Sequence, residues 1–220
     1  MSTEKEKKQN KVSDGISCDS NSLRLSAVIM ASGHSKRFGS NKLLADFLGK
    51  PLIEHLFEVI PAGLFERVLV VSIYDEVLSL AEKYGFTPVF NPDTTDDTAE
   101  TIRLGLTGLD KKSSGCVFFT GDQPGLSTDT IIKLAETFME DRTKICLPSF
   151  RGRRGNPVIF PSSFYADLSS LPPGEKGSLV IKAHPDYVRE VEISDSVDLE
   201  DADYPEELKR ITDILRSYSY

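Results

Sequence analysis

Short apolar segments alternate with amphipathic ones along almost all of this 220-residue chain, and no other feature constrains its fold as strongly. The apolar segments have the length and β-branched content of buried strands, whereas the others space their apolar residues as helices that cover a sheet do. We expect strands at 25–30, 67–73, 87–90, 116–120, 144–148, 157–160 and 187–193, and helices at 52–60, 76–84, 99–109, 127–140 and 206–215.

Strands separated by helices of about ten residues form right-handed βαβ units, so we expect an α/β fold with a mostly parallel sheet. The clearest helix spans 127–140, with Ser127 as its expected N-cap. In such sheets ligands collect at the carboxyl ends of the strands. The functional residues should therefore lie in the loops that follow strands.

A glycine-bearing loop, MASGHSKRFGSNK, follows the first expected strand. Gly33 and Gly39 let the backbone approach an anion, successive N–H groups can form a nest, and Arg37 and Lys42 supply positive charge. The sequence motif of this loop is G-x-S-x-R-x-G-x-x-K, with Ser35 at its third position. This pattern predicts a site for phosphate groups.

Two commoner phosphate loops are excluded by the spacing. A P-loop closes with Gly-Lys-Ser/Thr, but here Gly39 is followed by Ser40 and Asn41. A dinucleotide fingerprint requires a second glycine where Ser35 stands. Surface charge is the ordinary role of Arg and Lys, but the position of Arg37 and Lys42 after a core strand favours phosphate contact.

A carboxylate, Asp122, ends the apolar strand at 116–120 within Gly121-Asp122-Gln123-Pro124. By itself it could cap a turn. Opposite a phosphate loop it suits Mg²⁺, which takes one or two carboxylates together with phosphate oxygens and water. The scattered histidines and cysteines indicate neither a Ser/His/Asp triad nor a zinc site. Transfer to an ionised phosphate needs no strong general base, so positioning and charge neutralisation suffice.

Three further polar segments have both an ordinary and a functional interpretation. Residues 151–157 form a basic, glycine-bearing stretch that is either a solvated turn or a site for a second anion, the acceptor. Residues 173–178 precede a helix whose N-terminus would favour an anion. For the acidic residues between 198 and 203, the ordinary interpretation is a solvated loop that leads into the last helix. Pro205 would then lie near the first position of that helix.

Composition limits the class of protein. A net charge of −8 argues against a nucleic-acid or membrane-surface binder. Residues 1–22 are polar and lack aromatics, so we expect a disordered tail before a domain at 23–220. Without a signal-peptide pattern or a stretch of ~20 apolar residues, we expect a cytosolic (cytoplasmic) protein. Cys116 and Cys146 lie in apolar segments and should be buried thiols.

Across about residues 25–215 the chain resembles the MobA-like nucleotidylyltransferases, and most closely their molybdenum cofactor cytidylyltransferase branch. Met30–Lys42 matches the family loop, and Gly121-Asp122-Gln123-Pro124 matches its G-D-x-P motif. Arg154-Gly155-Asn156-Pro157-Val158 matches R-G-x-P-V, typical of the cytidylyl branch. Gly49–Leu52 matches the family's G-x-P-L turn, and Thr101–Leu106, Gly174–Gly177 and Asp201–Leu208 resemble further family motifs.

The resemblance implies a three-layer α/β/α sandwich like that of the nucleotide-diphospho-sugar transferases. It also implies transfer of a nucleoside monophosphate, CMP from CTP, to the phosphate of molybdopterin or molybdenum cofactor, with Mg²⁺ and release of pyrophosphate. The implied catalytic residues are Arg37, Lys42 and Asp122. The implied nucleotide-binding residues are Ala31, Ser32, Gly33, Ser35, Arg37, Gly39 and Lys42; the acceptor-binding residues are Arg154, Gly155, Asn156, Pro157, Lys176 and Gly177; the metal ligands are Asp122 and Asp203.

Two alternatives stay open. The same chemistry could act on another phosphorylated acceptor, such as a sugar phosphate, phospholactate or polyol phosphate. A non-catalytic protein could instead bind the cofactor during maturation of molybdenum hydroxylases, in contact with the molybdoenzyme or its chaperone.

Overall fold

The computed structural model describes residues 25–35, 38, 41–93, 95, 97–110 and 112–218. The expected tail at 1–22 and two candidate phosphate-binding residues, Arg37 and Gly39, lie outside the described residues.

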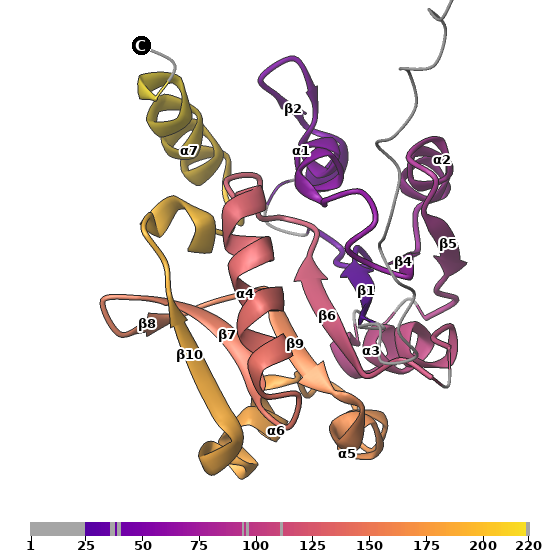
Figure 1. Cartoon of the computed structure of the whole chain (residues 1–220). Coiled ribbons are helices and arrows are strands. Elements are labelled where there is room, and N and C mark those ends of the chain that lie inside the picture. Colours follow the sequence, from indigo (N-terminus) through magenta and orange to yellow (C-terminus); the bar gives the residue numbers. More distant parts are fainter. Residues whose placement is uncertain are drawn as a thin grey trace, which may run out of the picture.

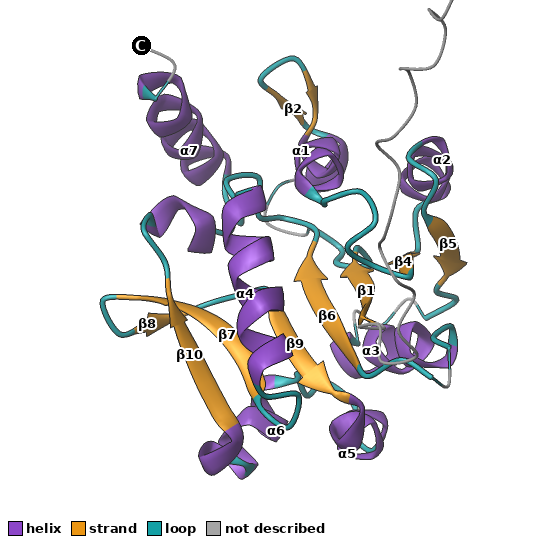
Figure 2. Cartoon of the chain, viewed as in Figure 1, coloured by secondary structure: helices purple, strands orange, loops and turns teal. Residues whose placement is uncertain are grey.

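Within the described residues, an eight-stranded sheet forms the centre of the fold (Figures 1 and 2). Its order is β10–β7–β9–β6–β1–β4–β5, and β8 pairs with β7. β1 is parallel to both β4 and β6, β4 is parallel to β5, and β7 is parallel to β10, which confirms the expected mostly parallel sheet. The strands are β1 (Leu25–Met30), β4 (Arg67–Ser72), β5 (Thr87–Phe90), β6 (Gly115–Thr120), β7 (Ile145–Phe150), β8 (Arg153–Arg154), β9 (Val158–Pro161) and β10 (Val188–Glu192).

Helices cover both faces of this sheet. Along β1, Ala27 and Ile29 point into one buried cluster and Val28 into the other, as strand alternation requires. α1, α2, α4 and α7 contribute to the first cluster, and α3, α5 and α6 to the second. The expected α/β/α sandwich is therefore confirmed. The helices are α1 (Leu52–Val59), α2 (Asp75–Lys83), α3 (Thr98–Thr107), α4 (Thr128–Glu140), α5 (Tyr165–Ser169), α6 (Ser178–Ala183) and α7 (Pro205–Ser217).

Most expected elements agree with the structure to within a few residues, and the Ser127 side chain caps α4 by accepting from Thr130 N. Cys116 and Cys146 are buried free thiols, as expected. Among the described residues, no helix is both long and apolar enough to cross a bilayer. Several short elements show too little periodicity to be expected from the sequence. They are β8, α5, η1 (Lys42–Leu44), β2 (Asp46–Phe47), β3 (Lys50–Pro51), η2 (Ser162–Phe164), η3 (Pro185–Tyr187) and η4 (Ser196–Leu199).

The sequence analysis did not predict the direction of β9. β9 runs antiparallel to both β6 and β7, and Val158 pairs with Phe118. The start of β9 therefore lies near the carboxyl end of β6. This brings the basic segment at 151–157, which precedes β9, to the edge of the sheet where ligands are expected.

The register of β1 sets the position of the site. Met30, the last residue of β1, pairs with Val71 on one side and with Thr120 on the other. Past the strand ends, Ala31 N donates to the Val71 carbonyl (2.8 Å) and Gly121 N to the Met30 carbonyl (3.0 Å). The chain passes from β1 to β4 and β5 on one side and reaches β6 on the other, so β1 and β6 flank a topological switch point.

Candidate active site

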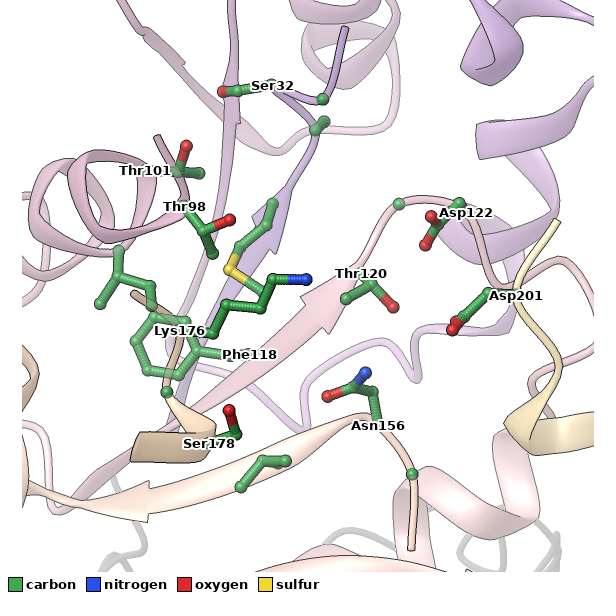
Figure 3. Close-up of a pocket in the computed structure, with 18 of the residues that line it drawn as sticks. Ser32, Thr98, Thr101, Phe118, Thr120, Asp122, Asn156, Lys176, Ser178 and Asp201 are labelled. Carbon is green, nitrogen blue, oxygen red and sulfur yellow. The ribbon is translucent and has the colours of Figure 1, made fainter. Parts of the chain in front are cut away.

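A cavity of about 860 Å³ opens at this switch point (Figure 3). It is lined by the loop after β1, the loop after β6, the N-terminus of α3, the segment before β9 and the segment before α6. Pro157 is not among its lining residues. The residues expected from the sequence that do line it are Ala31, Ser32, Gly33, Ser35, Lys42, Asp122, Arg154, Gly155, Asn156, Lys176, Gly177 and Asp203.

The first loop is held by its own hydroxyl groups. Ser32 is 7% exposed; its Oγ donates to the Val71 carbonyl (3.2 Å) and accepts from Asn91 Nδ2 (3.2 Å). Ser35 has a φ of +50°, and its Oγ accepts from the backbone N of Lys42 (3.2 Å). These bonds fix the path of the loop and leave its glycine main chain beside the cavity.

Lys42 begins η1, which Asn41 caps by accepting from Leu43 N (3.1 Å). Its Nζ donates to Asp122 Oδ2 (2.7 Å) and to Asp203 Oδ1 (2.8 Å). The Lys42 side chain is only 11% exposed. The phosphate-loop lysine and both candidate metal ligands therefore meet at one point, although the sequence analysis did not predict that the lysine would pair with them.

A backbone contact brings the acidic segment to this point. Ala202 N donates to the Asp122 carbonyl (2.9 Å), and the Ala202 side chain is fully buried. Because side chains alternate along an extended segment, Asp201 and Asp203 both face the cavity. Glu207, in the first turn of α7, accepts from Asp203 N (2.8 Å) and fixes the end of the segment.

The charged side chains of this cluster lie close enough together to shift the pKa values of Lys42 and Asp201. Burial opposes the charge of Lys42, but the Asp122 and Asp203 carboxylates outweigh it and raise its pKa above the usual value. Asp201 faces the concave cavity, where the loss of surrounding water and the charges of Asp122 and Asp203 raise its pKa to about 7.

The donor set fits a divalent ion that is shared with a substrate. Oδ1 of Asp122 is buried without a hydrogen-bond partner among the described residues, so it has an unused acceptor position. Within the same described part, no group of three or more His, Cys, Asp or Glu could hold a metal by itself. Mg²⁺ commonly takes one or two carboxylates and completes its shell with phosphate oxygens and water. Asp122 and Asp203 match that requirement.

The basic segment is a β-hairpin whose charges are partly paired. β7 turns into β8 through Arg151 and Gly152, both with positive φ. Arg153 then pairs with Glu200 (2.8 Å), and Arg154 pairs with Glu190 (2.7 Å). Arg154 lines the cavity, but its guanidinium is already paired with Glu190, which the sequence did not indicate.

Other lining residues were not singled out from the sequence, among them Thr98, Thr101, Thr120 and Asp201. Thr120 precedes Gly121-Asp122, and Figure 3 shows it between Asp122 and Asn156. Thr98 and Thr101 lie in the first turns of α3. The available signal was positional: Thr120 is the last residue of β6, Thr98 and Thr101 lie in the first turns of α3, and Asp201 lies shortly before α7.

A family model described as the MobA-like NTP transferase domain matches residues 27–188, more than half of the chain. The chain belongs to this family. The match spans the glycine loop, Asp122 and the hairpin that precedes β9.

Curated relatives with two different nucleotide preferences in their names are similar to the chain. A probable molybdenum cofactor guanylyltransferase from Thermococcus sibiricus is 30% identical over 60% of this chain and 65% of its own length. A pseudaminic acid cytidylyltransferase from Campylobacter jejuni is 30% identical over 53% of this chain and 54% of its own. The chain thus spans less than two thirds of these relatives, and they do not single out the cytidylyl branch expected from the sequence.

Solved structures share the fold. A homologue of the Mycobacterium tuberculosis protein Rv0371c, from Mycobacterium sp. strain JC1, superimposes with a TM-score of 0.76 at 24% identity, covering 89% of this chain and 100% of that one. Rv0371c of M. tuberculosis in complex with manganese gives a TM-score of 0.70 at 20% identity, covering 87% and 99%. The likeness to both confirms the α/β architecture.

Proposed function

We propose that this protein is a nucleotidylyltransferase: it transfers a nucleoside monophosphate, CMP from CTP, to the phosphate of a molybdopterin-type acceptor and releases pyrophosphate. One observation carries this proposal. Lys42, Asp122 and Asp203 converge beside a glycine loop at the switch point of the sheet. A cation, two carboxylates and a backbone that can approach an anion are the groups that phosphoryl-type transfer requires.

The reaction needs little covalent chemistry from the protein. An oxygen of the acceptor phosphate attacks the α-phosphorus of the triphosphate, and the bond from that phosphorus to the oxygen that bridges to the β-phosphorus breaks. The electron pair leaves with pyrophosphate, and the acceptor gains a nucleoside monophosphate in a new diphosphate bond. Because the attacking oxygen is already ionised, no side chain must remove a proton, which fits a site whose centre is charged rather than basic.

The chain's own residues would hold the reacting groups. The main chain at Gly33 would lie against the phosphates, with Ser32 and Ser35 fixing its path. Lys42, and by the sequence pattern Arg37, would offset the negative charge that develops on the transferred and leaving phosphates. Asp122 and Asp203 would hold Mg²⁺, which when bound supplies Lewis-acid stabilisation of the phosphate oxygens. The manganese complex of Rv0371c supports a divalent ion at such a fold.

The acceptor would occupy the opposite part of the cavity. Asn156, Gly155, Lys176 and Gly177 line that part. Arg154 would contribute mainly by holding the hairpin, because its guanidinium pairs with Glu190. Pro157 would shape the segment without contacting the acceptor.

The base and the acceptor define the finer part of the proposal. CTP is favoured by Arg154–Val158, which resembles the cytidylyl pattern, whereas the guanylyltransferase named among the relatives makes GTP the competing substrate. The sugar-acid cytidylyltransferase among them keeps other acceptors as candidates. A non-catalytic maturation protein is disfavoured by Lys42, Asp122 and Asp203 occurring together.

The deciding experiment measures pyrophosphate release from CTP and from GTP with Mg²⁺ present, with a molybdopterin-type acceptor, a sugar phosphate or no acceptor. We expect release from CTP only with the molybdopterin-type acceptor, and its loss in Asp122→Ala. Asp213→Ala removes an exposed carboxylate on α7 and should leave release unchanged. Pyrophosphate release from GTP, or with another acceptor, would change the nucleotide or the acceptor assigned here. Nucleotide binding without release under any condition would contradict the enzyme assignment.

A further inference from the structure

The acceptor side of the cavity depends on a short segment, residues 171–177, between α5 and α6. Pro172 to Glu175 form a turn: Glu175 N donates to the Pro172 carbonyl (3.1 Å), and Gly174 has a φ of +80°. Proline followed by glycine at the centre of a turn is typical of type II, which leaves the central N–H directed outward. The segment then delivers Lys176 to the cavity, where Figure 3 shows its amino group directed towards Thr120.

Two side chains hold this segment: Asp97, the N-cap residue of α3, and Arg103 within the helix. Asp97 Oδ1 accepts from Gly174 N (3.0 Å) and also from Ala99 N (2.8 Å), so the same oxygen caps α3 and anchors the turn. Arg103 Nη1 donates to the Leu171 carbonyl (3.0 Å), and its Nη2 lies 3.5 Å from Asp97 Oδ2. The side chain of Asp97 is only 11% exposed. We name Asp97 and Arg103 together the α3 clasp.

The clasp joins two parts of the cavity. Thr98 and Thr101, on the first turns of α3, line the wall next to the loop after β1. Asn91, which binds the Ser32 hydroxyl of that loop, also donates to Thr101 Oγ1 (3.3 Å). The α3 N-terminus is therefore fixed to the first loop on one side and, through Asp97, to the segment that carries Lys176 on the other.

We propose that Asp97 and Arg103 are positioning residues that hold residues 171–177, and with them Lys176, at the distance from the first loop that the acceptor requires. This inference rests on the proposed function for its substrate assignment. Neither clasp residue needs to touch the reacting atoms. Losing the clasp should weaken acceptor binding and leave nucleotide binding intact, because the contacts of the first loop with Val71 and Asn91 remain.

The test compares Asp97→Ala, Asp97→Asn and Arg103→Met with the unaltered protein. Asp97→Ala also removes the cap of α3. Arg103→Met leaves that cap in place and removes the bond to Leu171, together with the ion pairs to Asp97 and Glu100. Asp97→Asn keeps an oxygen that can accept from Gly174, so it should restore part of the effect. Asp167→Asn is the matched control: it removes a carboxylate that pairs with His184 (3.0 Å) near α6 and has no bond to residues 171–177.

Three readouts are needed: backbone hydrogen exchange of residues 171–178, the KM for each substrate, and nucleotide-induced thermal shift. We expect faster exchange in Asp97→Ala and Arg103→Met, an acceptor KM raised by about tenfold, and an unchanged nucleotide shift. In exchange rate and acceptor KM, Asp97→Asn should fall between Asp97→Ala and the unaltered protein. Asp167→Asn should match the unaltered protein.

Unchanged exchange in both Asp97→Ala and Arg103→Met would overturn the proposal, as would faster exchange with an unchanged acceptor KM. An equal loss of nucleotide binding would also overturn it, because the variants would then act through α3 itself. If the unaltered protein transfers to no acceptor, the proposed function fails, and hydrogen exchange of residues 171–178 alone decides whether the clasp holds the segment.

Discussion

Nζ of Lys42 lies 2.7 Å from Oδ2 of Asp122, at the edge where β1 and β6 end side by side. The same ammonium lies 2.8 Å from Asp203 Oδ1. The ammonium therefore already pairs with both carboxylates that the proposed function assigns to Mg²⁺. Under that proposal Lys42 and the ion would compete for Asp122 and Asp203, and a triphosphate would offer Lys42 other anionic partners.

Lys42→Ala should lower kcat/KM for nucleotidyl transfer by roughly 100-fold, the scale on which one preorganised electrostatic group stabilises a transition state. The pattern of the loop predicts a similar loss for Arg37→Ala, although Arg37 lies outside the described residues. Initial-rate kinetics of pyrophosphate release would measure both. Lys209→Ala, on the exposed side of α7, is the control for loss of a positive charge. An unchanged kcat/KM in Lys42→Ala would rule out the role assigned to the lysine.

Lys42→Met should bind Mn²⁺ more tightly than the unaltered protein when no nucleotide is present. The substitution roughly keeps the length of the side chain but removes the ammonium that pairs with Asp122 and Asp203, so Lys42 no longer competes with the ion for these carboxylates. Titration of Mn²⁺ followed by electron paramagnetic resonance or calorimetry measures the affinity. In Lys42→Met/Asp122→Asn the gain should disappear. Equal or weaker Mn²⁺ binding in Lys42→Met would show that lysine and metal do not compete.

His55→Gln should make stability less sensitive to acid. Burial is the main cause that lowers the pKa of His55 below its usual value of 6.5, and Lys50 adds to it; Glu54 and Glu58 act in the opposite direction. The neutral ring is thus favoured in the folded state, where Nε2 lies 2.6 Å from the Phe47 carbonyl. As pH falls through 6.5, the unfolded chain takes up a proton that the folded protein resists, so the free energy of unfolding decreases.

Urea unfolding of the unaltered protein and His55→Gln at pH 7.5 and pH 5.5 would test this prediction. The unaltered protein should lose more stability than the variant between the two conditions, because glutamine can donate to the carbonyl at either pH. The same loss in both proteins would show that His55 does not contribute to acid sensitivity.

Gly105→Ala should destabilise the fold although alanine favours helices. A Cβ at Gly105 of α3 would lie 2.6 Å and 2.9 Å from the two Cγ atoms of Val28, which is fully buried in β1. Overpacking of this kind costs about 1–3 kcal/mol, against a gain of about 1 kcal/mol in helix propensity. Denaturant unfolding should show a net loss of about 1–2 kcal/mol.

A double-mutant cycle with Val28→Ala separates the contact from the propensity effect. In that background the methyl groups that would collide with the new Cβ are gone, so Gly105→Ala should cost little or become stabilising. A cost that is the same in both backgrounds would place its cause elsewhere than at Val28.

Local patterns account for the parts of the fold that were predicted. The apolar run at Leu25–Met30 and the amphipathic helix ending near Glu140 both appear because periodicity and capping act over a few residues. The loop after β1 and Asp122 were identified for the same reason: each directly follows a strand. Strand ends in a parallel sheet share one edge, which was enough to predict that the two would be neighbours.

Long-range pairing accounts for what was missed. The Arg154 guanidinium looked available for an acceptor, but Glu190, on another strand, pairs with it. Asp97 was not among the expected site residues, yet its carboxylate accepts from the backbone N of Gly174, 77 positions away. No pattern within either segment specifies such a partner, since the partner is set by which strands and helices pack together.

The amino-acid order alone determined the class of fold, the glycine loop and the carboxylate that faces it, because strand period, helix period and loop chemistry are properties of neighbouring residues. Only the tertiary structure decided that Lys42 pairs with Asp122 and Asp203, that β9 runs antiparallel, and that α3 holds the segment of Lys176. The physical reason is that a charge takes its pKa and its partners from whatever packing brings within a few ångströms, and packing joins positions that the sequence keeps far apart.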